Sequence, residues 1–334
     1  MSAAGSPETE GETRAVLACR DVAVHFGGRA GWLTKPAAAV KAVDGVDLMV
    51  GRGETVGLVG ESGCGKSTLS NAIVGLVPPT RGSVRVAGRE VAGASRRALR
   101  EIRRDVQMIF QDPALSLDPR GTVGGAVGEP LAARGLARGR ALRERVAALL
   151  ADVGLSPDFA ARYPHQMSGG QRQRVVIARA LALEPALVVC DEPVSALDVS
   201  VRAQVLNLLV ALQRRTGVAY LFVSHDLAVV RHVCDRIAVM YLGRIVEEAT
   251  REVFFARAKH PYSRALLSAV LEADPVAQRG RTRVVLSGEL PSPARVPPGC
   301  AFHLRCPQAT AICRVERPLL TPRPDGARVA CHHA

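Results

Sequence analysis

The chain has 334 residues, of which 48% are hydrophobic, 22% are charged and only 4% are aromatic. This length and composition suffice for one large hydrophobic core or two smaller ones, and they exclude a disordered or collagen-like chain. The formal net charge is +13, which we attribute to a solvated basic surface in preference to nucleic-acid binding.

The termini and the hydropathy pattern bear on location. No stretch of 18 or more apolar residues occurs, so no membrane-spanning segment is predicted. Residues 1–14 are polar and acidic and lack the basic and apolar regions of a signal peptide. We therefore expect a cytosolic chain, and the basic excess over 251–334 would suit a position beside an anionic membrane surface.

The N-terminal part is predicted to consist mainly of strands. After a flexible leader (1–14), alternating patterns predict strands at 16–26 and 39–50, separated by an insertion that contains Trp32. In chain order there follow a buried strand at 55–59, a glycine-rich loop, a helix from about Lys66, and strands at 82–88 and 105–110.

Helices dominate from residue 122 and then alternate with strands. Helical spacing covers 122–163. The later elements are a helix at 169–183, a strand at 186–190, a helix with Val201, Val205, Leu208, Leu209 and Leu212 on one face, a strand at 218–223, a helix after His225 and a strand near 236–241. This alternation predicts the α/β class, with a mainly parallel sheet covered on both faces.

Gly60–Ser67 fits the pattern G-x-x-x-x-G-K-[ST] of a phosphate-binding loop. Its glycines let the backbone curl so that successive N–H groups face the phosphates, and the following helix adds its positive N-terminal end. Lys66 would supply a charge to the β- and γ-phosphates, and the Ser67 hydroxyl would ligate Mg²⁺. The nucleotide-binding residues expected here are Gly60, Glu61, Ser62, Gly63, Cys64, Gly65, Lys66, Ser67 and Thr68.

Asp191 and Glu192 end an apolar strand. Two buried acids are costly unless they meet a cation, so Asp191 is predicted to hold Mg²⁺, directly or through water. Glu192 would polarise the attacking water and is the predicted catalytic base. The alternative is a pair of acids that merely caps the next helix.

A second anion-binding helix N-terminus is predicted at Ser168–Arg174, which reads SGGQRQR. One triphosphate rarely needs two such sites, so we predict a dimer in which this helix caps a nucleotide on the other subunit. The alternative, an ordinary capped helix with a basic face, explains Ser168 but not the double glycine.

Together these segments resemble the ABC ATPases. Ser168, Gly169, Gly170 and Gln171 are similar to the signature sequence of that family, with Met167 where leucine is usual. The resemblance implies an ABC-type P-loop ATPase with a RecA-like core, an antiparallel β subdomain and a helical subdomain at about 112–175. The ATPase domain would span 15–272 and use ATP and Mg²⁺.

Four further positions acquire roles from this resemblance. Gln111 matches the Q-loop that senses Mg²⁺ and the γ-phosphate, and Asp198 matches the D-loop across the dimer. His225 matches the switch histidine at the γ-phosphate, the alternative being an ordinary strand-end histidine. Phe26 would stack on adenine; a buried strand-end aromatic is a nearly equal alternative. The expected Mg²⁺ ligands are Ser67, Gln111 and Asp191.

A closer resemblance is carried by Tyr163–Gln166, Met240–Gly243, His260–Leu267 and Ser287–Pro293. These segments are similar to the ATP-binding subunits of dipeptide/oligopeptide importers, and the signature region is more like the second of their two ATPases. The resemblance implies a paralogous ATPase partner in a heterodimer, two membrane permeases and an extracytoplasmic substrate-binding protein. It also implies a peripheral position on the cytoplasmic face of the plasma membrane, with no nucleic-acid partner.

Other functions remain open at this point. The transported solute could be nickel or another small molecule instead of a peptide, because selectivity resides in other chains. A soluble ABC ATPase that acts on nucleic acid is a less favoured alternative, motivated only by the positive charge.

The C-terminal part, 273–334, is predicted to be a Pro-rich linker followed by a small Cys-rich module. Its four cysteines are Cys300, Cys306, Cys313 and Cys331. Their loose spacing lacks the close pairs of zinc sites and favours a [4Fe–4S] cluster, which the resemblance also implies. Zinc and then reduced thiols are the alternatives, with His303, His332 and His333 as substitute ligands.

Overall fold

The computed structural model describes residues 15–27, 39–270 and 288–334. The predicted leader, the insertion with Trp32 and the first part of the predicted linker lie outside these residues. The chain divides into two compact units. The first comprises the described residues up to Leu17 together with Val50–Glu54 and Arg85–Phe222, and the second comprises Ala18–Met49, Thr55–Val84 and the described residues of Val223–Ala334.

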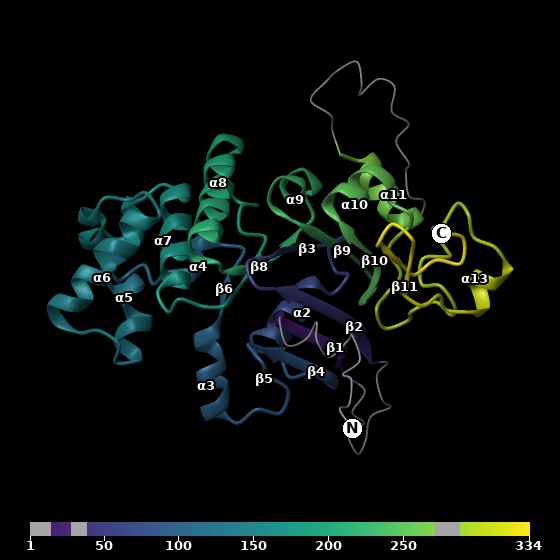
Figure 1. Cartoon of the computed structure of the whole chain (residues 1–334), viewed down its shortest axis with the longest axis horizontal. Helices are drawn as coiled ribbons and strands as arrows, with labels where there is room; N and C mark the ends of the chain where they lie inside the picture. Colours follow the sequence, from purple (N-terminus) through teal and green to yellow (C-terminus); the bar gives the residue numbers. More distant parts are fainter. Residues whose placement is uncertain (1–14, 28–38, 271–287) are drawn as a thin grey trace, which may run out of the picture. The chain divides into compact units, whose positions relative to one another are not determined.

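The first unit combines a short parallel sheet with a group of helices (Figure 1). Strand β6 (Val106–Ile109) pairs in parallel with β7 (Leu187–Asp191), and β8 (Ala219–Ser224) follows β7 in the sheet. The helices are α3 (Arg96–Asp105), α4 (Pro113–Ser116), α5 (Val123–Ala133), α6 (Gly139–Asp152), α7 (Gly169–Leu181) and α8 (Val199–Thr216), with 3₁₀ turns η1 (Pro157–Ala161) and η2 (Pro164–Gln166).

Close packing holds α5, α6 and α7 together in this unit. A Cβ at Gly128 on α5 would stand 3.2 Å from Val146 Cγ2 on α6, so the glycine permits the close approach of the two helices. Leu131, Ala182 and Leu183 form a buried cluster against which Leu142 packs. Throughout the described residues between β6 and β7, the regular structure is helical.

The second unit contains the remainder of the parallel strands. Strand β3 (Thr55–Val59) pairs in parallel with β9 (Arg236–Tyr241). Strand β10 (Arg244–Thr250) pairs antiparallel with β9, and β12 (Arg328–Val329) pairs antiparallel with β10 and with β11 (Thr321–Pro322). The helices are α2 (Lys66–Ile73), α9 (Leu227–Val233), α10 (Arg251–Arg257), α11 (Pro261–Ser268) and α13 (Ala311–Val315).

A second sheet contains the N-terminal strands. Strands β2 (Val40–Gly51), β1 (Ala15–Phe26) and β4 (Arg81–Val86) are neighbours in that order. Strand β4 turns back into β5 (Arg89–Glu90) as an antiparallel pair. The predicted strand at 82–88 is therefore wrong at its end, because Ala87 (φ 46°) and Gly88 (φ 76°) form a tight turn.

The prediction of a separate Cys-rich module is not supported. The described residues of the C-terminal part belong to the second unit, where β12 extends the sheet beyond β10. Phe302 is only 1% exposed and packs against Tyr241 and Tyr262. The tail is too short to bury a core of its own and completes that of the second unit instead. No helix in the described part of the chain is both long and apolar enough to cross a membrane.

Candidate functional site

The predicted phosphate-binding loop lies between β3 and α2 in the second unit. Every residue of β3 is buried, so the strand fixes the start of the loop. Helix α2 begins at Lys66 behind Gly65, which has a φ of 110° and provides no side-chain cap. The first N–H groups of α2 thus receive no side-chain bond from the N-cap position, the arrangement that suits an anion.

Two loop glycines are required by close neighbours. A Cβ at Gly60 would stand 2.3 Å from the carbonyl oxygen of Met240, and one at Gly65 would stand 2.0 Å from that of Ala42. The loop backbone therefore lies in close contact with β2 and with the end of β9. In addition, Gly243 N donates to Cys64 O at 2.8 Å, which ties the β9–β10 turn to the same loop.

Lys66 lies inside the loop, only 6% exposed. Its Nζ donates to Gly60 O at 2.8 Å and to Glu61 O at 2.9 Å. Cys64 is buried nearby, and burial raises the pKa of its thiol although Lys66 opposes this. Of the remaining predicted loop residues, Ser62, Gly63 and Ser67 are exposed, and Glu61 and Thr68 are half-buried.

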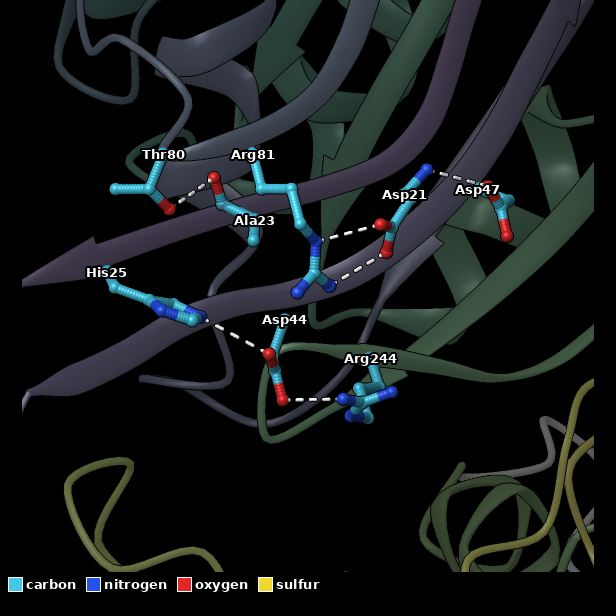
Figure 2. A network of polar contacts seen from close by, with 8 residues as sticks. All are labelled: Asp21, Ala23, His25, Asp44, Asp47, Thr80, Arg81 and Arg244. Atoms are coloured by element: carbon cyan, nitrogen blue, oxygen red, sulfur yellow. Dashed lines mark hydrogen bonds and ion pairs between the residues drawn. The ribbon is translucent and has the colours of Figure 1, made fainter.

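A polar network includes His25, the residue before Phe26 at the end of β1 (Figure 2). Asp44 accepts from His25 Nε2 at 3.2 Å and from Arg244 Nη2 at 2.5 Å. Burial acts to raise the pKa of Asp44, but the hydrogen bond and charge of Arg244, with smaller contributions from Lys41 and His25, lower it overall. The network fixes the strand end, while Phe26 remains 45% exposed. The alternative prediction of a buried strand-end aromatic is therefore wrong.

The predicted catalytic carboxylate lies in the first unit. Glu192 follows β7 with a φ of 49°, a left-handed conformation that is uncommon for a non-glycine residue. Its Oε2 accepts from Gln111 Nε2 at 3.1 Å, so the structure brings these two predicted residues together. Asp191 ends β7 and, like Glu192, is half-buried.

The predicted signature segment begins α7. Ser168 Oγ accepts from Gln171 N at 3.3 Å and Gln171 Oε1 accepts from Ser168 N at 3.0 Å, a reciprocal capping box. The alternative of an ordinary capped helix thus accounts for Ser168 and Gln171. Gly170 has a separate explanation, because a Cβ there would stand 2.3 Å from Val201 Cγ1 on α8.

Replacing Gly170 by alanine should therefore destabilise the first unit. Overpacking of this kind costs about 1–3 kcal/mol of unfolding free energy, measurable by urea unfolding. Gly169→Ala is the matched control, because its Cβ would lie 3.5 Å from Leu197 Cδ2, an ordinary contact. Adding Val201→Ala should restore most of the loss; equal stability of the two glycine variants would contradict the prediction.

Two other predicted residues are exposed. Asp198 is the N-cap of α8, without a side-chain cap bond, and lies in the first unit. His225 lies in the second unit between Ser224, whose Oγ accepts from Asp226 N at 3.0 Å, and Asp226, which caps α9. The predicted site residues are thus divided between the two units.

Sequence reasoning missed a group of residues that hold the loop from the C-terminal part. Tyr262 OH accepts from Glu61 N at 2.8 Å, and Arg305 pairs with the Glu61 carboxylate through both terminal nitrogens. The sequence of the segment around Tyr262 indicates only a family resemblance. No local sequence pattern indicates a role for Arg305, because its partner Glu61 lies 244 residues away in the chain.

His260 supports this segment and has an unusual titration. Burial, followed by the charge of Arg264, lowers the pKa of His260 to about 3. The His260 Nδ1 accepts from Tyr262 N at 3.1 Å, and the backbone N–H of His260 donates to the Glu247 carboxylate. Burial raises the pKa of the Glu247 carboxyl. Its effect on the pH dependence of stability is therefore opposite in sign to that of His260.

We expect the unfolding free energy to fall as the pH drops from about 6.5 towards 3, because the unfolded state then binds more protons at His260. The slope contributed by this one group is at most about 1.4 kcal/mol per pH unit. His260→Asn retains a capping acceptor and should show a shallower loss in urea unfolding between pH 7 and pH 5.5. Identical slopes in the two proteins would contradict the assignment.

The C-terminal cysteines do not form an assembled metal site. Among the described residues, no group of three or more His, Cys, Asp or Glu side chains is arranged to hold a metal ion. Cys313 Sγ lies 3.5 Å from His333 Nε2, and Cys331 Sγ accepts from His333 N at 3.4 Å. The predicted [4Fe–4S] cluster is therefore not supported by the structure.

The sequence is similar to known families and proteins along almost its whole length. The ABC transporter family model matches residues 43–195, and a second model, described as the C-terminal region of oligopeptide/dipeptide transporters, matches residues 246–313. The oligopeptide transport ATP-binding protein OppF of Escherichia coli is 51% identical over 315 residues, which cover 93% of this chain and 94% of that protein. The di/tripeptide transport ATP-binding protein DppF of Pseudomonas aeruginosa is 49% identical over 319 residues, covering 96% and 98%.

The fold is shared with a solved ABC cassette. The dimeric ATP-binding cassette MJ0796 in a post-hydrolysis state with ADP and Pi is 33% identical, with a TM-score of 0.62, covering 70% of this chain and 98% of that one. The predicted ABC ATPase fold is thereby confirmed. Its sequence and its fold together show that the chain belongs to the ATP-binding proteins of the ABC transporters. Within this family, its relatives are the ATP-binding proteins of oligopeptide and dipeptide transport.

Proposed function

We propose that this chain binds and hydrolyses ATP to drive the uptake of di- or oligopeptides, at the cytoplasmic face of the membrane. The observation that carries the proposal is the match to peptide-transport ATPases along almost the whole chain, including the C-terminal region. That region lies outside the general ABC transporter match and favours peptides over nickel or another small solute.

The loop at 60–68 binds the triphosphate in this proposal. Lys66 Nζ would exchange its bonds to Gly60 O and Glu61 O for bonds to phosphate oxygens, at the N-terminal end of α2. Phe26 would stack on the adenine, which its 45% exposure permits.

Mg²⁺ would be held by Ser67, Gln111 and Asp191 together with phosphate oxygens and water. A hydroxyl, an amide and one carboxylate are hard oxygen ligands that fit this ion. Such a site needs no preformed group of three acidic or imidazole ligands. The ion supplies charge neutralisation at the phosphates.

Glu192 is the proposed general base. Gln111 Nε2 donates to one of its carboxylate oxygens, and the backbone of Glu192 is in the left-handed conformation directly after β7. A carboxylate held in this way would accept a proton from the attacking water. His225, exposed between two capping residues, would contact the γ-phosphate.

The α7 N-terminus and Asp198 would act across a dimer with a paralogous ATPase. Ser168, Gly169 and Asp198 are exposed, as a contact with a second chain requires. The cassette MJ0796, which shares the fold, is described as dimeric. The complete importer would add two membrane permeases and a substrate-binding protein.

Purification of the tagged chain from its own membranes in mild detergent tests this proposal. Mass spectrometry should identify two permeases and a second ATPase among the co-purifying chains. The associated binding protein would then be screened for peptide binding. Co-purified ribosomal proteins or nucleic acid that resist nuclease and salt would overturn the transport proposal.

For the four C-terminal cysteines we retain a [4Fe–4S] cluster as a proposal. It is supported by contacts within this group: Cys300 N donates to Cys313 O at 2.9 Å, and His333 contacts both Cys313 Sγ and Cys331 Sγ. The thiols would have to rearrange to bind the cluster. Anaerobically purified protein should contain iron and acid-labile sulfide with broad visible absorption; stoichiometric zinc, or no metal at all, would overturn it.

A further inference from the structure

Glu61, the first residue of the phosphate-binding loop after Gly60, is held at both its backbone and its side chain. Its N–H donates to Tyr262 OH at 2.8 Å. Arg305 Nη1 donates to its Oε2 at 2.7 Å, and Arg305 Nη2 donates to its Oε1 at 3.0 Å. This two-pronged pairing fixes both the position and the plane of the carboxylate.

Tyr262 is itself fixed by a chain of polar contacts from β10. The Glu247 carboxylate, 1% exposed, accepts from Lys259 N at 2.7 Å and from His260 N at 3.0 Å. His260 then caps α11 by accepting from Tyr262 N. Since all of these groups are buried or backbone-bound, the Tyr262 hydroxyl has little freedom to move.

Arg305 is anchored by an aromatic cluster. Phe302 lies 5.2 Å from Tyr241 and 5.5 Å from Tyr262 between ring centroids. Arg305 N donates to Phe302 O at 2.9 Å in the following turn, and the Arg305 side chain is only 7% exposed. The yellow C-terminal segment in Figure 1 reaches β10 through β12, which pairs with that strand.

The contacts of Glu61 continue to Lys66, because Glu61 O accepts one of the Lys66 Nζ bonds at 2.9 Å. A loop with three glycines at positive φ (Gly60, Gly63 and Gly65) has many conformations available to it. Only some of them place the N–H groups and Lys66 toward a phosphate. External contacts that select these conformations reduce the entropy lost on nucleotide binding.

We propose that Tyr262 and Arg305 are positioning residues for ATP binding: through Glu61 they hold the phosphate-binding loop and Lys66 in the conformation that receives the nucleotide. The C-terminal part therefore sets the nucleotide affinity of the ATPase. This inference rests on the proposed assignment of residues 60–68 as the phosphate-binding loop.

The test is the equilibrium dissociation constant for ATP, measured by fluorescence with the full chain, alongside the melting temperature. Arg305→Ala is expected to weaken ATP binding about tenfold, and Tyr262→Phe, which removes only the hydroxyl, about threefold or more. Arg305→Lys should recover part of the loss, because a single ammonium replaces the two-pronged contact. Combining Glu61→Gln with Arg305→Ala should add little to the single changes, since both break one pair.

Arg328→Ala is the matched control. Arg328 also ties the C-terminal part to the body of the unit, through Glu248 on β10, but it does not touch the loop. Its removal should leave ATP affinity unchanged even if the melting temperature falls. An equal loss of affinity in Arg328→Ala, or a lower melting temperature without an affinity change in Arg305→Ala, would overturn the inference in favour of simple anchoring.

Lys66→Ala separates this inference from the proposed function. Normal ATP binding by that variant would show that the loop assignment itself is wrong. If Lys66→Ala abolishes binding while Tyr262→Phe and Arg305→Lys both bind as the unchanged protein does, the loop is correct and the positioning role is wrong. These two mild variants retain most of the buried volume and keep the test valid should Arg305→Ala fail to fold.

Discussion

Glu192→Gln should abolish ATP turnover while ATP binding remains intact. The amide has the shape of the carboxylate and can still accept from Gln111 Nε2, so the 3.1 Å contact and the local backbone should persist. It cannot accept a proton, however, and loss of a general base lowers kcat by about 10²- to 10⁴-fold. Phosphate release by the assembled transporter and ATP binding by fluorescence measure the two effects separately.

The matched control for this prediction is Glu184→Gln. Glu184 lies in the same unit and also has a left-handed backbone, with a φ of 52°. Its side chain is 77% exposed and pairs with Arg145 at 2.8 Å, away from Gln111. Turnover should be unchanged in Glu184→Gln, whereas normal hydrolysis by Glu192→Gln would reject Glu192 as the base.

Lys66→Ala should weaken ATP binding by about ten- to a hundredfold. The ammonium would otherwise bond to phosphate oxygens, and a hydrogen bond to a charged group contributes about 1.5–3 kcal/mol. The substitution also leaves Gly60 O and Glu61 O without the donor that now fixes them inside the loop. Isothermal titration with ATP in the presence of Mg²⁺ measures the loss.

Lys259→Ala is the control for Lys66. The Lys259 side chain is 23% exposed and pairs with Asp325 at 2.7 Å, so the control removes a lysine and an ion pair without touching the loop. Its ATP affinity should match that of the unchanged protein. Equal binding by Lys66→Ala and Lys259→Ala would exclude Lys66 as a phosphate ligand.

Strands and helices with strong hydrophobic patterns were predictable. The strands at 55–59, 186–190, 218–223 and 236–241 are confirmed as β3, β7, β8 and β9. Strand β10 was missed because it carries two adjacent acids, Glu247 and Glu248, in a buried position. Glu247 is satisfied by backbone N–H groups and Glu248 by Arg236 and Arg328, partners that no local pattern shows.

The parts of the site that consist of consecutive residues could be predicted from the sequence. The phosphate-binding loop and the acids after β7 follow from short motifs that fix their own geometry. The double glycine of the α7 start was interpreted only as an anion site, whereas Gly170 is also required by Val201 on another helix. Close approach between helices depends on tertiary packing, which one sequence does not display.

The contact between Glu61 and Arg305 joins two residues that are 244 positions apart. During synthesis the phosphate-binding loop is therefore made well before Arg305. The loop lacks its two-pronged partner until translation has passed residue 305. A nascent chain halted before residue 305 should bind ATP less tightly than the full chain, so that tight nucleotide capture is delayed until this residue has been added.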